Sequence, residues 1–198
     1  AKYDRLAAKS EYQALKTSTK VLATWDDHDY GSNDTGRHYP HKKESKDLFL
    51  NFFNEPADSE RRQHEGIYTS YQFQIHGKAL QIILLDTRTF RDDLRKYRGE
   101  LHHVDKYFYP LDYFPHQNTD STLLGSAQWE WLEKELLKPA DVRIIGSSTQ
   151  FGIEYNGYEA WANFPHEQKK MTEMNEWLDE VCAALGVDRG LLAEVTPE

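Results

Sequence analysis

The stretch Tyr71-Gln-Phe-Gln-Ile-His-Gly-Lys-Ala-Leu-Gln-Ile-Ile-Leu-Leu-Asp-Thr-Arg88 decides the predicted fold. Apolar and polar residues alternate from Tyr71 to Ile75, which is the period of a half-buried strand. His76-Gly77 suits a two-residue hairpin turn. The returning strand, residues 80–85, is apolar on both faces, as expected in the interior of a covered sheet. It ends in the polar cluster Asp86-Thr87-Arg88.

Two other short apolar runs end in polar loops in the same way. Val21 to Trp25 leads into Asp26-Asp27-His28-Asp29, and Val142 to Ile145 leads into Gly146-Ser147-Ser148. We predict a buried strand for each run. In open α/β sheets, ligands bind where the carboxyl ends of strands meet. The three polar loops are therefore expected to converge.

Helical patterns lie between and after these strands. Residues 45–53 place Leu48, Phe49, Phe52 and Phe53 on one face. Ser126 is predicted to cap a helix that ends before Pro139. Residues 91–120 show no clear period and are expected to form a long excursion over the sheet edge. Strands that alternate with helices indicate an α/β fold.

Composition sets the broad class of the protein. The 198 residues carry 24 Lys+Arg against 33 Asp+Glu, a net charge of −9, which suits one acidic globular domain and argues against a nucleic-acid surface. The single cysteine, Cys182, excludes an intramolecular disulfide and is interpreted as a buried apolar residue. No apolar run approaches the roughly 20 residues that span a bilayer, and the first residues are not those of a signal peptide. Since the chain lacks an initiator Met, we expect a processed product or an internal piece.

The loop that follows Trp25 carries the densest chemistry. Asp26, Asp27, His28, Asp29, Asn33 and Asp34 place four carboxylates, an imidazole and an amide within nine residues. Calcium, magnesium and manganese prefer such oxygen ligands, and imidazole suits zinc or iron as well. The alternative is an acidic, solvated turn. Because crowded carboxylates repel one another, a cation or an arginine is expected nearby.

Five motifs in order resemble the PhoD-like alkaline phosphatase D family of the calcineurin-like metallophosphoesterase superfamily. They are Thr-Trp-Asp-Asp-His-Asp-Tyr-Gly-Ser-Asn-Asp-Thr-Gly (24–36), Leu-Leu-Asp-Thr-Arg-Thr-Phe-Arg (84–91), Leu-Leu-Gly-Ser-Ala-Gln-Trp-Glu-Trp-Leu (123–132), Gly-Ser-Ser-Thr-Gln-Phe (146–151) and Glu-Ala-Trp-Ala-Asn-Phe-Pro (159–165). The resemblance covers residues 1–171, which would be the central part of the family's domain.

The resemblance implies a portion of a four-layer αββα sandwich with a two-metal site that activates a hydroxide. Laid on this sequence, it makes Asp27, with Asp26 beside it, a metal ligand. It makes His28 the residue that contacts the phosphate or leaving group, and Asp29 the carboxylate that orients this histidine. The site would hold two metal ions, and the sequence does not distinguish among calcium, iron, manganese and magnesium.

Two further residues are candidates for substrate binding. Arg88 follows a buried strand and can contact a phosphate oxygen bidentately. A structural ion pair of Arg88 with Asp86 or another carboxylate is an equal alternative. Asn33 is the second candidate.

The sequence also departs from the family. An upstream Asp pair and a late Gly-Asp-x-His motif are missing, and residues 172–198 instead predict an amphipathic helix, Met174 to Leu185, outside the family pattern. The origin of this tail is left open among a fusion, a chimera, a shifted reading frame and divergence.

The functional prediction is metal-dependent hydrolysis of small phosphoesters, monoesters or diesters. The alternative is a catalytically incomplete piece of that fold that binds a cation weakly at most. A calcium-binding module is disfavoured because no Asp-x-Asp-x-Asp-Gly loop is present. The resemblance alone implies export from the cell, and oligomeric state is not predicted. Other candidate groups are interpreted as structural or surface residues, namely Ser147, Ser148, His38, His41, His64, His102, His103, His116 and His166.

Overall fold

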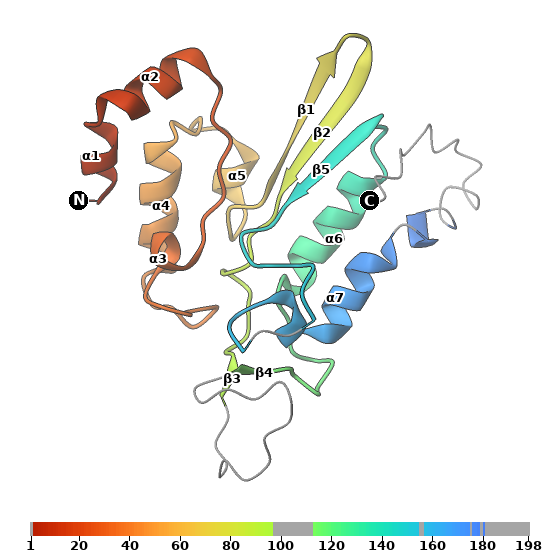
Figure 1. The fold of residues 1–198 in the computed structure, drawn as a ribbon. Coiled ribbons are helices and arrows are strands. Elements are labelled where there is room, and N and C mark those ends of the chain that lie inside the picture. The colour runs from red at the N-terminus through yellow and green to blue at the C-terminus, as the bar shows by residue number, and fades with distance from the viewer. Residues whose placement is uncertain (1, 97–112, 155–156, 175, 179, 181–198) are drawn as a thin grey trace.

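The computed structural model describes residues 2–96, 113–154, 157–174, 176–178 and 180 (Figure 1). Within them, helices and strands alternate irregularly along the chain. The elements are α1 (Lys2–Ala7), α2 (Ser10–Ser18), α3 (Asp27–Tyr30), α4 (Lys42–Phe52), α5 (Glu60–Gln63), β1 (Thr69–Ile75), β2 (Lys78–Leu84), β3 (Arg95–Lys96), β4 (Tyr113–Phe114), α6 (Gly125–Leu136), β5 (Val142–Gly146), the 3-10 helix η1 (Trp161–Asn163) and α7 (Pro165–Thr172). The predicted mixed α/β class is confirmed.

The main sheet has the strand order β1-β2-β5. β1 and β2 form the predicted antiparallel hairpin, with Ile75 opposite Lys78 and Thr69 opposite Leu84. His76 and Gly77 both have positive φ, 50° and 79°, as a tight primed turn requires. β2 pairs with β5 in parallel. Because parallel strands need a crossover, α6 lies between them in the chain.

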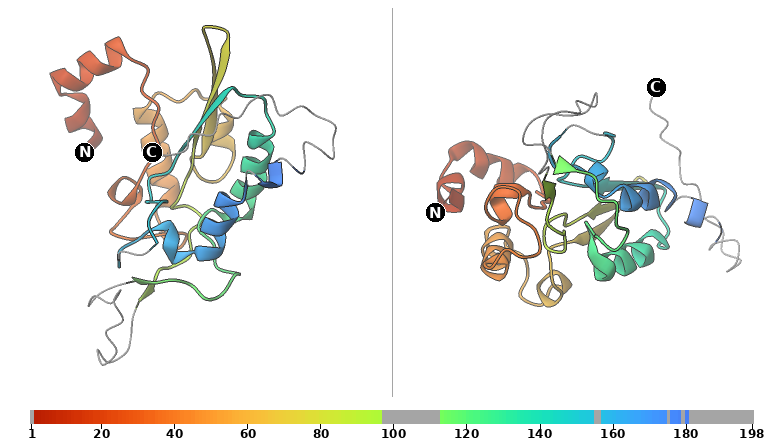
Figure 2. Two further views of the ribbon diagram at one scale, coloured as in Figure 1. Left: turned by 45° about the vertical axis from the view of Figure 1, so that its right-hand side comes forward. Right: turned by 90° about the horizontal axis from the view of Figure 1, so that it is seen from below.

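α6 covers one face of the sheet (Figures 1 and 2). The Gln81 side chain donates to the backbone carbonyl of Glu135 at 3.1 Å, and Ile83 is fully buried beneath the helix. Trp129, Leu132 and Leu136 of this helix lie in the same core. This core also includes Leu85, Leu123, Leu124, Trp161, Phe164, Met174 and Leu178.

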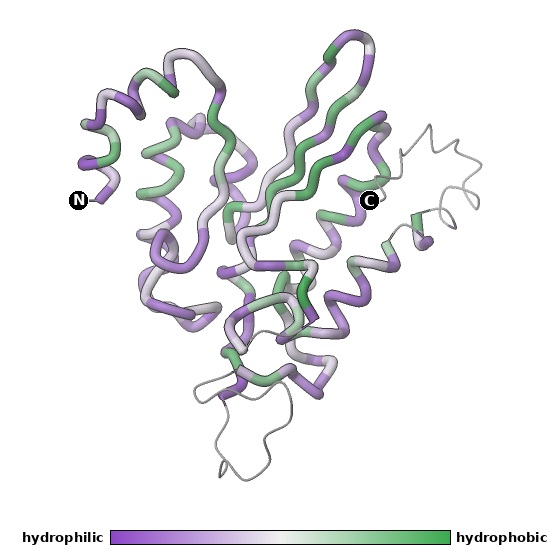
Figure 3. The backbone as a smooth tube through the Cα atoms, viewed as in Figure 1, coloured by the Kyte–Doolittle hydropathy of each residue, from purple (hydrophilic) through white to green (hydrophobic). Residues whose placement is uncertain are grey.

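The opposite face of the sheet is apolar and largely open within the described residues. Figure 3 shows the apolar stretches of β2 and β5 side by side. Val142 and Ile144 are 47% and 51% exposed, and they lie opposite Leu80 and Ile82 of the central strand. The Lys20 ammonium lies over this face, 5.3 Å from the ring centroids of β1 aromatics.

A second, smaller core lies against α4. Phe49 and Leu50 are buried there with Trp25, Tyr30 and Ile67. The predicted helix is confirmed, but its predicted apolar face was wrong in one residue. Leu48 is 58% exposed. Its neighbour Leu50 points into the core instead.

Three local predictions differ from the structure, namely the strand at residues 21–25, the burial of the strand at residues 142–145 and the cap of α6. Residues 21–25 form no strand, since the Thr24 hydroxyl, not a backbone ladder, links this segment to Leu85. β5 is half-exposed because it is an edge strand with an open face. Ser126 does not cap α6, whose first amide, that of Gly125, donates to the Thr122 hydroxyl at 2.7 Å.

Several predictions fall on residues outside the described ranges. These include His102, His103, Cys182, most of the 91–120 excursion and the later part of the helix predicted to end at Leu185. Met174 and Leu178 from the start of that helix are described and buried. Among the helices that the structure describes, none has the length and apolar character needed to span a bilayer.

Candidate functional site

Three segments meet at the carboxyl ends of β2 and β5. The Thr24 hydroxyl donates to the carbonyl of Leu85 at 2.7 Å, and the Leu85 amide donates to the carbonyl of Gly146 at 2.9 Å. The Thr87 hydroxyl lies 2.9 Å from that of Ser148 and 2.7 Å from that of Thr149. The three polar loops therefore converge as expected, although the first follows an extended segment and not a strand.

Asp86 anchors this junction from inside the protein. Its fully buried carboxylate accepts hydrogen bonds from the Trp25 indole, the Ile67 amide, the Arg88 and Thr89 amides and the Thr89 hydroxyl. A buried carboxylate is tolerated when donors surround it in this way. Asp86 therefore orders the loop after β2 and does not face the candidate site.

Arg88 is the buried centre of a network of charged side chains. Its Nε donates to Asp26 Oδ1 at 3.1 Å and its Nη1 donates to Glu159 Oε2 at 2.7 Å, while Nη2 donates to both carboxylates. Its Nη1 also lies 3.5 Å from Asp27 Oδ1. The Arg88 side chain is 0% exposed. This geometry matches the structural ion pair that we considered as the alternative to phosphate binding, with Asp26 and Glu159 as the partners.

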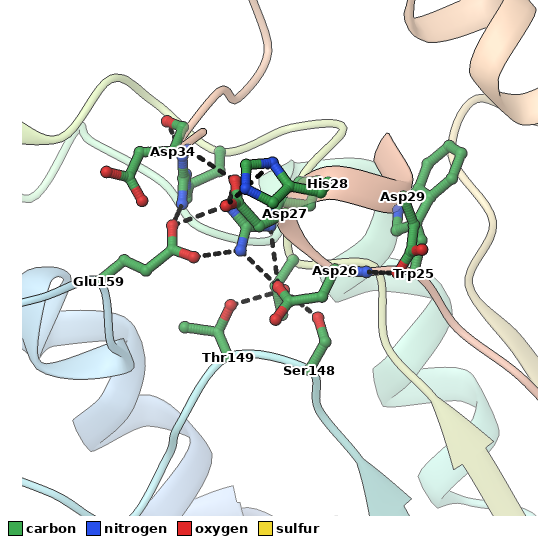
Figure 4. Close-up of polar contacts among 12 residues, drawn as sticks. Trp25, Asp26, Asp27, His28, Asp29, Asp34, Ser148, Thr149 and Glu159 are labelled. Carbon is green, nitrogen blue, oxygen red and sulfur yellow. Dashed lines mark hydrogen bonds and ion pairs between the residues drawn. The ribbon is translucent and has the colours of Figure 1, made fainter. Parts of the chain in front are cut away.

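Asp27, Asp34 and Glu159 form a group of carboxylates whose nearest oxygens all lie within 4.8 Å of one another. The Asp34 amide donates to Asp27 Oδ1 at 2.6 Å, and Asp34 itself has a positive φ of 56°. The Tyr113 hydroxyl donates to Asp34 Oδ2. The side chains converge from separate segments in Figure 4. Among the described residues, this arrangement could hold a cation.

His28 lies at the outer edge of this group, on the one-turn helix α3. Its side chain is 64% exposed, and Nδ1 lies 3.6 Å from Asp27 Oδ2. Among the described residues, no contact joins the Asp29 carboxylate to His28. The Asp29 carboxylate accepts from the Asp26 amide at 3.4 Å and lies beside Trp25, away from Glu159 (Figure 4). The carboxylate nearest to His28 is that of Asp27.

Asn33 is exposed, and its amide nitrogen donates to Asp34 Oδ2 at 2.7 Å. The structure therefore brings together four of the predicted site residues, Asp26, Asp27, His28 and Arg88. Asn33 lies at the edge of this group, and the Asp29 carboxylate points away from it (Figure 4).

The electrostatics of the network favour charged partners. Burial opposes ionisation of Glu159, but hydrogen bonds and attraction from Arg88 and Arg91 outweigh it and hold the pKa of Glu159 below its ordinary value. Burial likewise disfavours the Arg88 cation, yet Glu159 and Asp26 raise the pKa of Arg88. Burial, followed by Asp34, raises the pKa of the Tyr113 hydroxyl.

Sequence reasoning missed Glu159, Arg91 and Tyr113 as members of the site. Arg91 is 1% exposed and donates to Glu159 Oε2 and to the carbonyl of Asp34, both at 2.5 Å. Glu159 and Arg91 stand in motifs quoted above, so the signal was present, but nothing in the sequence paired them. Tyr113 lies in a stretch without a clear pattern.

The residues interpreted as structural have contacts of that kind. Ser147 accepts from the Trp161 indole at 2.9 Å and donates to the carbonyl of Thr149 at 2.7 Å. The His64 ring stacks on Tyr68 and the His116 ring on Phe164.

The sequence matches a family described as PhoD-like phosphatase over residues 1–181. No curated protein matches it. A solved structure titled "Structure of PhoD" aligns with a TM-score of 0.49 and 20% identity. The alignment covers 79% of this chain and 31% of that one, so this chain spans less than a third of that protein's length.

Proposed function

This chain belongs to the PhoD-like phosphatase family, and from that membership we propose that it serves the metal-dependent hydrolysis of small phosphate monoesters or diesters. The observation that carries the proposal is the convergence of Asp27, Asp34 and Glu159 beside His28. This group lies at the carboxyl ends of β2 and β5, where α/β proteins bind ligands.

The donor set suits a hard cation. Asp27 and Asp34 offer carboxylate oxygens and are only partly exposed. Four carboxylates, those of Asp26, Asp27, Asp34 and Glu159, face two guanidinium groups, so the carboxylates outnumber the arginines. Calcium, magnesium, manganese and iron ions accept such ligands. A bound ion would act as a Lewis acid that offsets charge on the phosphoryl oxygens.

The His28 side chain is exposed, and its imidazole is a group that can donate a proton. In the proposed reaction its imidazole donates a proton or a hydrogen bond to the oxygen of the leaving group. Asp27, 3.6 Å from Nδ1, would accept from Nδ1–H and orient the ring, so that the protonated imidazolium presents Nε2–H to the substrate. This assigns to Asp27 the orienting role that the family resemblance gave to Asp29.

A two-metal mechanism needs ligands for two ions. Among the described residues, only the carboxylates of Asp27, Asp34 and Glu159 form a group that could hold a metal ion, and one such group is too few for two ions. We therefore keep the second candidate, a chain that folds and binds one cation without turnover of its own. Both candidates share the same cation-binding loop. They differ in whether this chain, by itself, completes the site.

We also propose that a second β-layer covers the open face of the sheet and completes a four-layer arrangement. The support is the exposure of Val142 and Ile144 on a face that also carries Leu80 and Ile82. Soluble proteins rarely leave such apolar patches uncovered.

The test of the proposed function is made on the purified chain. Metal content is measured by elemental analysis, and hydrolysis of a chromogenic phosphomonoester and phosphodiester is followed with added calcium, iron, manganese or magnesium. We expect stoichiometric metal with turnover if the site is complete, and weak metal binding at most, without turnover, if it is not. A chain that binds none of these metals contradicts the proposal.

Matched variants locate the chemistry. Asp27→Asn is expected to abolish metal binding, whereas Asp141→Asn, at the opposite end of the strands, leaves it unchanged. His28→Gln is expected to abolish turnover and retain the metal. His41→Gln is its control, because the two histidine side chains are similarly exposed, 64% and 67%. Equal effects of the two histidine variants would contradict the role of His28.

A further inference from the structure

One partly buried carboxylate, that of Glu159, contacts both arginines that hold the loop 26–34 in place. We propose that Glu159 is a positioning residue, which acts through Arg88 and Arg91 to fix the two ends of the loop that carries Asp27 and His28. The functional part of this inference rests on the proposed function, which makes that loop the reactive one.

Arg88 holds the first end of the loop. Its Nε and Nη2 donate to Asp26 Oδ1, and its Nη1 and Nη2 donate to the two oxygens of Glu159. A guanidinium is a rigid planar fork, so its position on Glu159 determines where it presents donors to Asp26. Asp26 in turn precedes α3, the turn on which Asp27 and His28 lie.

Arg91 holds the second end. Its Nη1 donates to Glu159 Oε2 and its Nη2 donates to the backbone carbonyl of Asp34. The backbone carbonyl of Arg91 accepts from the Arg37 amide at 2.8 Å. Gly36 makes this approach feasible, because a Cβ atom there would lie 2.4 Å from the Arg91 oxygen.

Glu159 is thereby distinguished from the aspartates near it. Both of its oxygens accept from guanidinium groups, and those groups are 0% and 1% exposed. Two buried cations beside one carboxylate oppose the approach of a metal ion to it. Asp27 and Asp34 remain the ligands, and Glu159 serves as the counter-ion that keeps both arginines in place.

The test measures amide hydrogen exchange by NMR in the full 198-residue chain. The Tyr30 and Gly31 amides report the first end of the loop, since they donate to the carbonyls of Asp26 and Asp27. The Arg37 amide reports the second end. In Glu159→Gln we expect all three amides to exchange roughly tenfold faster, while amides of the β1–β2 hairpin keep their rates.

The arginine variants separate the two ends. Arg88→Lys keeps the charge but not the fork, and is expected to speed exchange at Tyr30 and Gly31 only. Arg91→Lys is expected to speed exchange at Arg37 only. These variants also serve if Glu159→Gln does not fold. Uniform acceleration over the whole domain, or unchanged loop amides in Glu159→Gln, would overturn the proposal.

Manganese binding, followed by electron paramagnetic resonance, tests whether the position of the loop affects metal binding by Asp27 and Asp34. Glu159→Gln is expected to weaken binding by about tenfold through misplacement of Asp27 and Asp34, and Glu159→Asp, which retains the charge, to restore part of it. The control is Glu55→Gln, since Glu55 is 15% exposed and pairs with the buried Arg61 at 3.5 Å, away from the site. Equal weakening in Glu55→Gln would overturn the inference.

The exchange measurement remains informative if the wild-type chain binds no metal and turns over no ester. That result would contradict the proposed function. The pattern of the three loop amides would still show whether Glu159 fixes the loop.

Discussion

The indole nitrogen of Trp25 donates to Asp86 Oδ1 at 2.9 Å, although 61 positions separate the two residues in the sequence. Both residues are buried. Trp25 directly precedes the acidic loop, and Asp86 follows β2. The hydrogen bond therefore ties the start of the candidate site to the end of the central strand.

Trp25→Phe tests this tie. Phenylalanine retains the ring packing against Tyr30 and Phe49 but removes the donor to Asp86. We expect the free energy of unfolding to fall by about 1–3 kcal/mol, the usual cost of leaving a buried acceptor short of a partner. Urea denaturation measures it. Trp131→Phe, at a partly buried indole, is the control and should cost less.

Gly36→Ala tests the close approach of the loop to Arg91. The new Cβ atom would lie 2.4 Å from the Arg91 carbonyl oxygen, so the backbone must move apart. We expect a loss of about 1–3 kcal/mol in stability, as for other overpacked positions. The matched variant is Gly152→Ala, where no atom lies within 4 Å of the added Cβ. Equal melting temperatures of the two variants in thermal unfolding would refute the steric argument.

Ile83→Ala and Ile144→Ala test the two faces of the sheet. Ile83 is fully buried beneath α6, and its truncation is expected to cost about 2–5 kcal/mol. Ile144 is 51% exposed, so in a chain without the second β-layer proposed above its truncation should cost about 1 kcal/mol or less. Chemical denaturation compares them. A large cost at Ile144 would mean that the open face is covered in solution.

His64 predicts a pH dependence of stability. Burial, with Lys46 and Arg61 nearby, lowers the pKa of His64 from its ordinary value of 6.5. As the pH falls below about 6.5, the unfolded chain therefore binds the proton first, and stability is lost until the pH reaches the lower pKa of the folded state. Above about pH 6.5 the unfolded chain no longer binds this proton preferentially, so this loss of stability is absent.

The variant His64→Phe retains the stacking on Tyr68 and removes the titrating group. Between about pH 7.5 and about pH 5 it is expected to lose less stability than the wild type, as urea denaturation at each pH would show. A steeper loss in His64→Phe would contradict the sign of the pKa shift.

The sequence by itself determined the features that depend on near neighbours. The alternation from Tyr71 to Ile75 and the turn at His76-Gly77 specify the hairpin, because strand period and turn geometry are local properties. The apolar spacing of residues 45–53 specifies α4 in the same way. The sequence also identified the acidic loop and, through its ordered motifs, the family.

Only the tertiary structure decided which of these side chains meet. Arg88 contacts Asp26 across 62 positions and Glu159 across 71, and no local pattern encodes either pairing. It likewise turned Asp29 away from His28 and left residues 21–25 without a strand. The physical reason is burial: an arginine withdrawn from water must find carboxylates wherever the fold places them.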